Sequence, residues 1–462
     1  MTKSILHVWM LSAAFMGCVN SGSAQRSSKQ EARAQNPYKI EAVKSYIDGL
    51  INEMAGDLDA AARDFQMAIM LDTSSNTMYA SLADNYMLTG QPEKSLRIVQ
   101  KILSREPNHV AALELLSEIQ IQKHEFENAV TTLERIIQID PAHVEVHYRL
   151  ITIYEIQGKW NEAAAHYTAL LNVLGPNTLL TLKLSDMYMK NKAFAKAADV
   201  LSNARSGDPN NIYILEALAQ AYEFNKEFPK ALSTYETLSD LQDNSPMILL
   251  RVGSLSLQSG QYEKSIAAFK KADAITPNIP EVQRSLGFSF SQLKRSDDAI
   301  RYFEKAISLN HKDVLSMSLL TPLYQEKKWL DKSDSLFEKI LTLEPENDII
   351  LNNYSYSLAE RGISLEKALL MVQKALKIAP GNAHFLDTMG WVYYQMGLYE
   401  LALKYVLQAN QTNAGSWEVA DHLGDIHAKL KNDSEAKSYW QKALQLNPEN
   451  ETIKKKLNST DH

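Results

Sequence analysis

Alanine or serine recurs with a period of about 34 residues through most of the chain, and this repeat constrains the fold more than any other feature. We call these the rung positions: Ala61, Ser95, Ala129, Ala163, Ala197, Ala231, Ser265, Ala299, Ser333, Ala368, Ala402 and Ala436. The spacing is constant except for one extra residue before Ala368. A large apolar side chain follows four residues after each rung. Such a period indicates one structural unit repeated along the chain, rather than separate globular domains.

Each unit is predicted to be a helical hairpin. A small residue, a large apolar residue four positions later and an apolar residue three further on share one stripe of a helix. In seven repeats proline follows twelve residues after the rung and stops this helix before the next one begins. A second amphipathic helix precedes each rung, as in residues 386–394. After Pro448, polar residues predict a short capping helix, because the last hairpin would otherwise expose its apolar face.

The hairpins resemble the tetratricopeptide repeat, whose pattern is W-x2-L-G-x2-Y, then A-x3-F-x2-A, then P. Two of the best matches are Leu286, Gly287, Phe290, Ala299, Phe303 and Ala306, and Leu423, Gly424, Ala436, Trp440, Ala443 and Pro448. The glycine of the first helix is present at Gly49, Gly253, Gly287, Gly390 and Gly424. The resemblance implies an all-α, right-handed α-solenoid of about twelve hairpins. We assign the repeats to residues 42–449 and the capping helix and tail to residues 450–462.

Residues 1–24 have the features of a targeting segment. Lys3 precedes an apolar run at residues 5–17, which is shorter than the about 20 residues of a membrane-spanning helix and typical of a signal peptide. Cys18 follows this run, and residues 15–18 resemble the lipobox of bacterial lipoproteins, so we expect Cys18 to be the site of lipid attachment. The alternative is ordinary cleavage after Ala24, which removes Cys18. Residues 19–40 are largely polar and are predicted to be a flexible tether.

The composition argues against most kinds of chemistry. The net charge of -7 argues against nucleic acid as a partner, because phosphate binding needs a basic face. A single cysteine cannot close an internal disulfide or form a cysteine-rich zinc site. The chain has no phosphate loop or nucleophile elbow, and we interpret His143 and His147 as two surface histidines rather than metal ligands. We therefore expect no enzyme activity, metal, cofactor or small-molecule substrate.

The family resemblance places partner binding in a concave groove lined by the first helices of the repeats. Near the C-terminus, aromatic and acidic residues occur together at the groove positions. The predicted groove residues are Asn353, Tyr356, Asp387, Trp391, Tyr394 and Asp425, and His384 and Asp421 occupy similar positions. Aromatic side chains beside acids suit a peptide-binding site, and the acids favour a basic or neutral segment. The alternative is that Trp391 and Tyr394 pack between adjacent repeats.

These observations predict a non-catalytic protein–protein interaction scaffold of the bacterial cell envelope. Residues 351–359 and 385–394 resemble a tetratricopeptide family of Gram-negative envelopes. We expect an outer-membrane lipoprotein that faces the periplasm and contacts the membrane only through its lipid anchor, or alternatively a soluble periplasmic protein. The second functional hypothesis is an obligate accessory subunit of an envelope assembly or export machine, for polysaccharide secretion or outer-membrane protein assembly. Such a subunit would have a large apolar interface.

Overall fold

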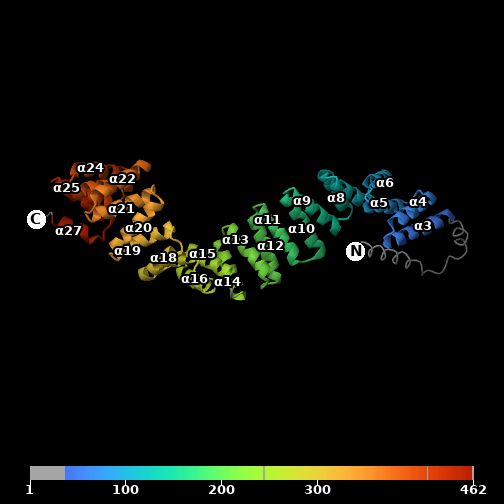
Figure 1. The fold of residues 1–462 in the computed structure, drawn as a ribbon, viewed down its shortest axis with the longest axis horizontal. Helices are drawn as coiled ribbons and strands as arrows, with labels where there is room; N and C mark the ends of the chain where they lie inside the picture. The colour runs from blue at the N-terminus through green and yellow to red at the C-terminus, as the bar shows by residue number, and fades with distance from the viewer. Residues whose placement is uncertain (1–36, 243–244, 414, 460–462) are drawn as a thin grey trace. The chain divides into compact units, whose positions relative to one another are not determined.

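The computed structural model describes residues 37–242, 245–413 and 415–459. Within these ranges the chain forms helices α3 to α27 and no strand (Figure 1). The all-α fold of helical hairpins predicted from the sequence is confirmed. The chain divides into two compact units, the first ending at Glu227 and the second beginning at Phe228. The predicted signal segment and Cys18 lie outside the described residues.

The first unit contains five consecutive hairpins followed by one further helix. Its helices are α3 (Pro37–Met54), α4 (Leu58–Leu71), α5 (Asn76–Leu88), α6 (Pro92–Arg105), α7 (Val110–Gln122), α8 (Phe126–Ile139), α9 (Val144–Ile156), α10 (Trp160–Leu174), α11 (Thr178–Lys190), α12 (Phe194–Gly207) and α13 (Ile212–Phe224). Helix α3 begins at Pro37 and so includes residues 37–40, which we had assigned to the tether. Proline suits the first turn of a helix, where its missing N–H would have no partner.

The second unit begins with one helix, continues with six hairpins and ends in a short helix. Its helices are α14 (Phe228–Leu241), α15 (Pro246–Gln258), α16 (Tyr262–Ile275), α17 (Pro280–Gln292), α18 (Ser296–Leu309), α19 (Val314–Glu326), α20 (Leu330–Leu343), α21 (Asp348–Glu360), α22 (Leu365–Ile378), α23 (Ala383–Gln395), α24 (Tyr399–Thr412), α25 (Trp417–Lys429), α26 (Asp433–Leu446) and α27 (Glu451–Ser459). Helix α27 lies where the capping helix was predicted. The two helices of the sixth predicted repeat, α13 and α14, belong to different units.

The rung positions form the centre of the packing in every hairpin. All twelve rung residues are 0% exposed, and the apolar side chains four residues later are at most 6% exposed. Full burial of a side chain such as leucine or phenylalanine contributes about 1.5–3 kcal/mol. The small rung residue and the large residue one turn later therefore account for the stacking of successive helices.

Glycine in the first helix makes room for an aromatic ring of the second helix in four repeats. A Cβ atom at Gly49, Gly253, Gly287 or Gly424 would lie 2.4 to 2.8 Å from the ring of Phe65, Phe269, Phe303 or Trp440, respectively. Real Cβ atoms essentially never come within 3.0 Å of another heavy atom. In these repeats the space left by the glycine is therefore filled by the aromatic ring that follows sixteen residues later.

His147 is buried in the first unit beside the half-buried His166, which corrects our interpretation of His147 as a surface residue. His143 is the N-cap residue of α9, and His147 lies one turn later on the buried face of that helix. The Nδ1 atom of His147 lies 2.9 Å from Nδ1 of His166 on α10, and its Nε2 lies 3.0 Å from the carbonyl oxygen of Pro141. His143 instead contacts Glu114, with 3.0 Å between Nε2 and Oε1.

This pair should make the first unit sensitive to acid. Burial of the imidazole, together with neighbouring His147, lowers the pKa of His166 to about 4. The unfolded value is about 6.5, so the unfolded chain takes up a proton before the folded chain does as the pH falls. We expect the first unit to lose stability between about pH 6.5 and pH 4.

Urea unfolding across this pH range measures the effect. His166→Gln should reduce the acid-induced loss of stability, whereas replacing the exposed His124 with glutamine should leave it unchanged. An equal loss of stability in His166→Gln and in the wild type would contradict the prediction.

Candidate partner-binding surface

The predicted groove residues lie on α21, α23 and α25, the first helices of the last three hairpins. Each helix begins at a polar N-cap residue whose side chain accepts a hydrogen bond from a backbone N–H of the first turn. These caps are Asn347, Asn382 and Ser416. Capping contributes about 1 kcal/mol per helix and starts the three helices at equivalent positions of the repeat. Groove residues about one repeat apart in the sequence can therefore lie beside one another.

Trp391 of α23 packs between two other rings. Its ring centroid lies 4.6 Å from that of Tyr394 and 4.1 Å from that of His422 on α25, in nearly parallel stacks. Only 8% of Trp391 is exposed, and its Nε1 atom is buried without a hydrogen-bond partner. The tryptophan therefore packs between adjacent repeats, as in the alternative weighed from the sequence. Its contact with a partner stays a prediction.

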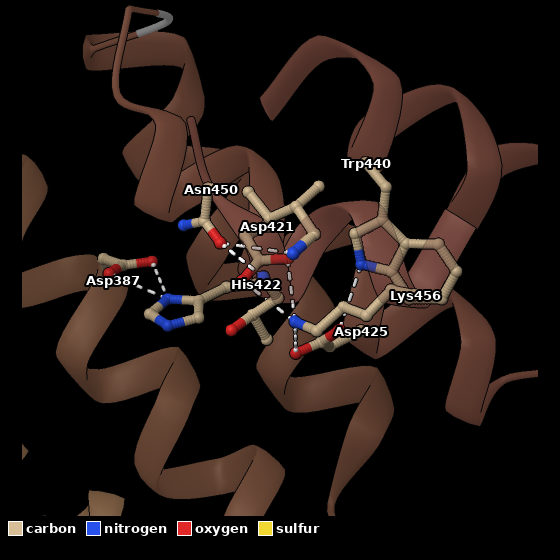
Figure 2. Close-up of polar contacts among 9 residues, drawn as sticks. Asp387, Asp421, His422, Asp425, Trp440, Asn450 and Lys456 are labelled. Carbon is tan, nitrogen blue, oxygen red and sulfur yellow. Dashed lines mark hydrogen bonds and ion pairs between the residues drawn. The ribbon is translucent and has the colours of Figure 1, made fainter. Parts of the chain in front are cut away.

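Asp387 of α23 is paired with His422 inside the protein. The Nδ1 atom of His422 lies 3.0 Å from each carboxylate oxygen of Asp387, and both residues are buried (Figure 2). Burial disfavours the charged imidazole, but the attraction and hydrogen bonding of Asp387 outweigh burial and raise the pKa of His422 above its ordinary value. The pair thus joins two successive first helices, and its carboxylate is not available to a partner.

Asp421 and Asp425 of α25 are bridged by a lysine of the capping helix. Lys456 Nζ donates hydrogen bonds to both carboxylate oxygens of Asp421, at 2.8 and 2.9 Å, and to Oδ2 of Asp425 at 2.7 Å (Figure 2). Trp440 Nε1 also donates to Oδ1 of Asp425, at 3.0 Å. Helix α27 is held by this contact and by Ile453, which is fully buried. The capping helix therefore balances much of the negative charge of these two acids.

The accessible part of the candidate surface is centred on two half-buried tyrosines. Burial, with the carboxylates of Glu360, Asp387 and Glu418 nearby, raises the pKa of Tyr356. Burial and the carboxylate of Asp425 raise the pKa of Tyr394 to about 12. Asn353, Glu360 and Glu418 are exposed. We call Asn353, Tyr356, Glu360, Tyr394 and Glu418 the aromatic–acidic surface.

Three residues of this region were not selected from the sequence as groove residues: Glu360, Glu418 and His422. The partner of His422 is Asp387, 35 residues earlier. Lys456 likewise lies 35 residues after Asp421. Opposite charges separated by one repeat plus one residue were the signal that could have found both pairs.

Two further findings apply to the described ranges alone. No group of three His, Cys, Asp or Glu side chains within them could hold a metal ion. Of the helices that the structure describes, none combines the length and the apolar character needed to cross a membrane.

Three models of the tetratricopeptide repeat match the sequence, at residues 216–280, 285–313 and 417–450. Among curated proteins, TPR repeat-containing protein PA4667 of Pseudomonas aeruginosa is 37% identical over 86 residues, which are 19% of this chain and 14% of that protein. TPR repeat-containing protein MJ1428 of Methanocaldococcus jannaschii is 32% identical over 126 residues, 27% of this chain and 21% of that protein. The matches thus span about a seventh and a fifth of these relatives' lengths.

Two solved structures align with most of this chain. The Naa15/Naa10 complex bound to HypK-THB aligns with a TM-score of 0.48 at 12% identity, covering 88% of this chain and 68% of that chain. Yeast Tom70 aligns with a TM-score of 0.34 at 15% identity, covering 91% of this chain and 95% of that chain.

Proposed function

Because the chain is a tetratricopeptide-repeat protein, we propose that it is a non-catalytic scaffold that binds partner proteins or peptides on the first helices of its repeats. We propose the aromatic–acidic surface of the second unit as the partner-binding site. Tyr356 and Tyr394 border the Trp391–His422 stack, with ring centroids 6.4 Å from His422 and 4.6 Å from Trp391, respectively, and we infer that this packing orders both rings. Rings that are already ordered lose little entropy on binding, and tyrosine is enriched among residues that dominate binding energy.

The charges of this surface favour a basic or neutral peptide segment. Asp387, Asp421 and Asp425 are paired with His422 and Lys456 inside the protein. Glu360 and Glu418 are the exposed acids beside Tyr356. We therefore propose that these two glutamates, rather than the three aspartates, select the charge of the partner.

Binding measurements on charge-reversed variants test this site. The partners are first isolated by pull-down of the full chain from detergent-solubilised membranes, and their affinity is then measured by calorimetry. Glu360→Lys and Glu418→Lys should each raise the Kd about tenfold, since loss of one charged contact costs about 1.4 kcal/mol. Glu400→Lys, an exposed acid on α24, is the matched control and should leave the Kd unchanged. Equal affinity of all three variants would reject the surface as the binding site.

The pull-down also separates the two functional hypotheses. A scaffold with several partners should yield proteins in variable amounts. An obligate subunit of an envelope assembly or export machine should yield one partner set in constant stoichiometry, with an interface larger and more apolar than the aromatic–acidic surface.

We also propose that the protein is an envelope lipoprotein anchored through Cys18. The support is the apolar run at residues 5–17, followed directly by the sole cysteine and a polar segment. Two or more acyl chains would hold the protein firmly at the membrane, whereas one chain holds only marginally.

Replacing Cys18 with alanine should move the protein from the membrane fraction to the soluble fraction after cell disruption. Ser21→Ala, in the same polar segment, is the control and should remain in the membrane fraction. If Cys18→Ala and the wild type fractionate identically, the lipid anchor is rejected, and a soluble periplasmic protein becomes the better proposal.

A further inference from the structure

The first helix of the first unit exposes a continuous apolar stripe. Five large residues of α3 lie on its outer face: Ile40, Val43, Ile47, Ile51 and Met54, which are 58%, 49%, 43%, 57% and 66% exposed. Their spacings of three and four residues place them on one side of the helix. Ala42 and Gly49, which are buried, lie on the opposite side. The stripe is thus the face of α3 turned away from the core.

Part of this face lies where later repeats have a covering helix. Ser81 and Asn85, one repeat after Ile47 and Ile51, are half-buried and buried, whereas Thr77 and Leu88, one repeat after Val43 and Met54, are exposed. Helix α5 packs on α4, and α7 packs on α6, so each of these first helices contacts the second helix of the preceding hairpin. Among the described residues no helix precedes α3. At the other end of the described chain, α27 covers the last hairpin and buries Ile453.

The residues just before α3 are poorly suited to cover the stripe. Residues 19–36 contain Val19 as their one aliphatic residue larger than alanine. A segment of this composition cannot bury five large apolar side chains. The apolar run at residues 5–17 is assigned by our proposed function to the signal segment.

The spacing of the stripe is symmetric about Ile47. Val43 and Ile51 lie four residues on either side of it, and Ile40 and Met54 lie seven residues on either side. A second copy of α3, packed antiparallel about a two-fold axis at Ile47, would place Ile47 against itself and Val43 against Ile51. Two-fold contacts of this kind use the same patch on both subunits.

The charges beside the stripe match the same arrangement. At about 3.6 residues per turn, Lys44 and Asp48 lie along one edge of the stripe. Both side chains are exposed, and the two-fold axis brings this edge of one copy beside the same edge of the other. Lys44 of each copy would then lie near Asp48 of the second copy. Within one copy, Lys44 Nζ lies 3.8 Å from Oε1 of Glu41, which is also exposed.

We propose that α3 is a homodimer contact, in which two copies of this chain pair their first helices antiparallel about Ile47. The contact joins apolar stripes that match under two-fold symmetry and adds two symmetric Lys44–Asp48 pairs. The exclusion of residues 5–17 as the occupant rests on the proposed function, whereas the contact itself concerns α3 in the first unit.

Disulfide cross-linking tests the contact and its register. The full chain carries Cys18→Ser, so that an introduced cysteine is the only thiol. Under mild oxidation Ile47→Cys should cross-link to a second copy, because a disulfide requires Cα atoms within about 7 Å. A mixture of Val43→Cys and Ile51→Cys should cross-link more than either variant alone. Leu370→Cys, on α22 and 68% exposed, is the control and should stay uncross-linked.

Sedimentation equilibrium of the chain without added cysteines gives the second measurement. Ile47→Glu should raise the dimer Kd at least about a hundredfold, while circular dichroism stays unchanged because the residue is on the surface. Lys44→Glu and Asp48→Lys should each weaken the dimer, and a mixture of the two should restore it, because both mixed pairs are then oppositely charged.

Three outcomes would overturn the proposal. The first is a wild-type chain that remains monomeric at every concentration. The second is a thiol at position 47 that reacts with alkylating reagent only after residues 1–18 are removed, which would make the chain's own N-terminal segment the occupant. The third is loss of vesicle binding in Ile47→Glu without any dimer in the wild type, which would assign α3 to a lipid surface.

Discussion

Gly390→Ala should destabilise the second unit by about 2 kcal/mol through overpacking, although alanine is the better helix former. A Cβ atom at this position would lie 2.3 Å from Val406 Cγ2, 3.0 Å from the carbonyl oxygen of Ala402 and 3.2 Å from the backbone nitrogen of Val406. The last two atoms belong to the backbone of α24 and cannot rotate away. Overpacking costs about 1–3 kcal/mol, and the upper end applies here because the helices themselves must separate. The gain in helix propensity from glycine to alanine is only about 1 kcal/mol.

Gly207→Ala is the matched control for this effect. Gly207 ends α12, and a Cβ there would meet nothing within 4 Å. The control should therefore stabilise the protein by up to about 1 kcal/mol. Urea unfolding gives both free energies, and hydrogen exchange in α23 and α24 locates the change. Unchanged unfolding free energy and unchanged hydrogen exchange in Gly390→Ala would contradict the prediction, because they would mean that α23 and α24 can separate to admit the methyl group at no cost in stability.

Asp387→Asn should destabilise the second unit by about 3 kcal/mol at pH 6, because it removes one partner of a buried ion pair and leaves the other without compensation. The effect should depend on pH. Asp387 raises the folded-state pKa of His422 above its unfolded value. The stability from this pair is fully present below the unfolded pKa of about 6.5 and is lost as the pH rises through the folded-state pKa. The destabilisation by Asp387→Asn should therefore be smaller at pH 9 than at pH 6.

A double-variant cycle separates this interaction from other effects of the substitutions. Unfolding free energies are measured at both pH values for Asp387→Asn, His422→Gln and the double variant. At pH 6 the double variant should lose less stability than the sum of the two single variants, because the pair is removed only once. Additive losses at pH 6, or a loss by Asp387→Asn that is the same at both pH values, would show that the pair contributes no such linked stability.

The regular part of the fold could be predicted because its information is local. Ala299 and Phe303 lie one turn apart on the same helix, so their burial follows from helix geometry and from the need to cover a stripe of apolar residues. The same reasoning holds at each rung. The interpretation of His147 failed because its burial depends on where α9 begins: with His143 at the N-cap, His147 falls on the inner face of the helix.

The candidate surface was harder to predict because its charges are decided between repeats. Asp387, Asp421 and Asp425 have the composition of a free acidic groove, but each has a partner on another helix: His422 of α25 for Asp387, and Lys456 of α27 for the other two. No spacing within one helix indicates such a partner. Which acids stay exposed, here Glu360 and Glu418, follows only after these pairs are known.

The amino-acid sequence by itself determined the repeat, the hairpin and the positions of the buried residues, because these depend on side-chain size at spacings of one or two helical turns. Only the tertiary structure decided that Trp391 packs between Tyr394 and His422, that Lys456 balances the charge of Asp421 and Asp425, and that no other described helix covers the apolar face of α3. The physical reason is distance along the chain. Packing within a helix is set by residues one or two turns apart, whereas contacts between repeats join side chains that are about one whole repeat apart, and their approach depends on how successive hairpins stack.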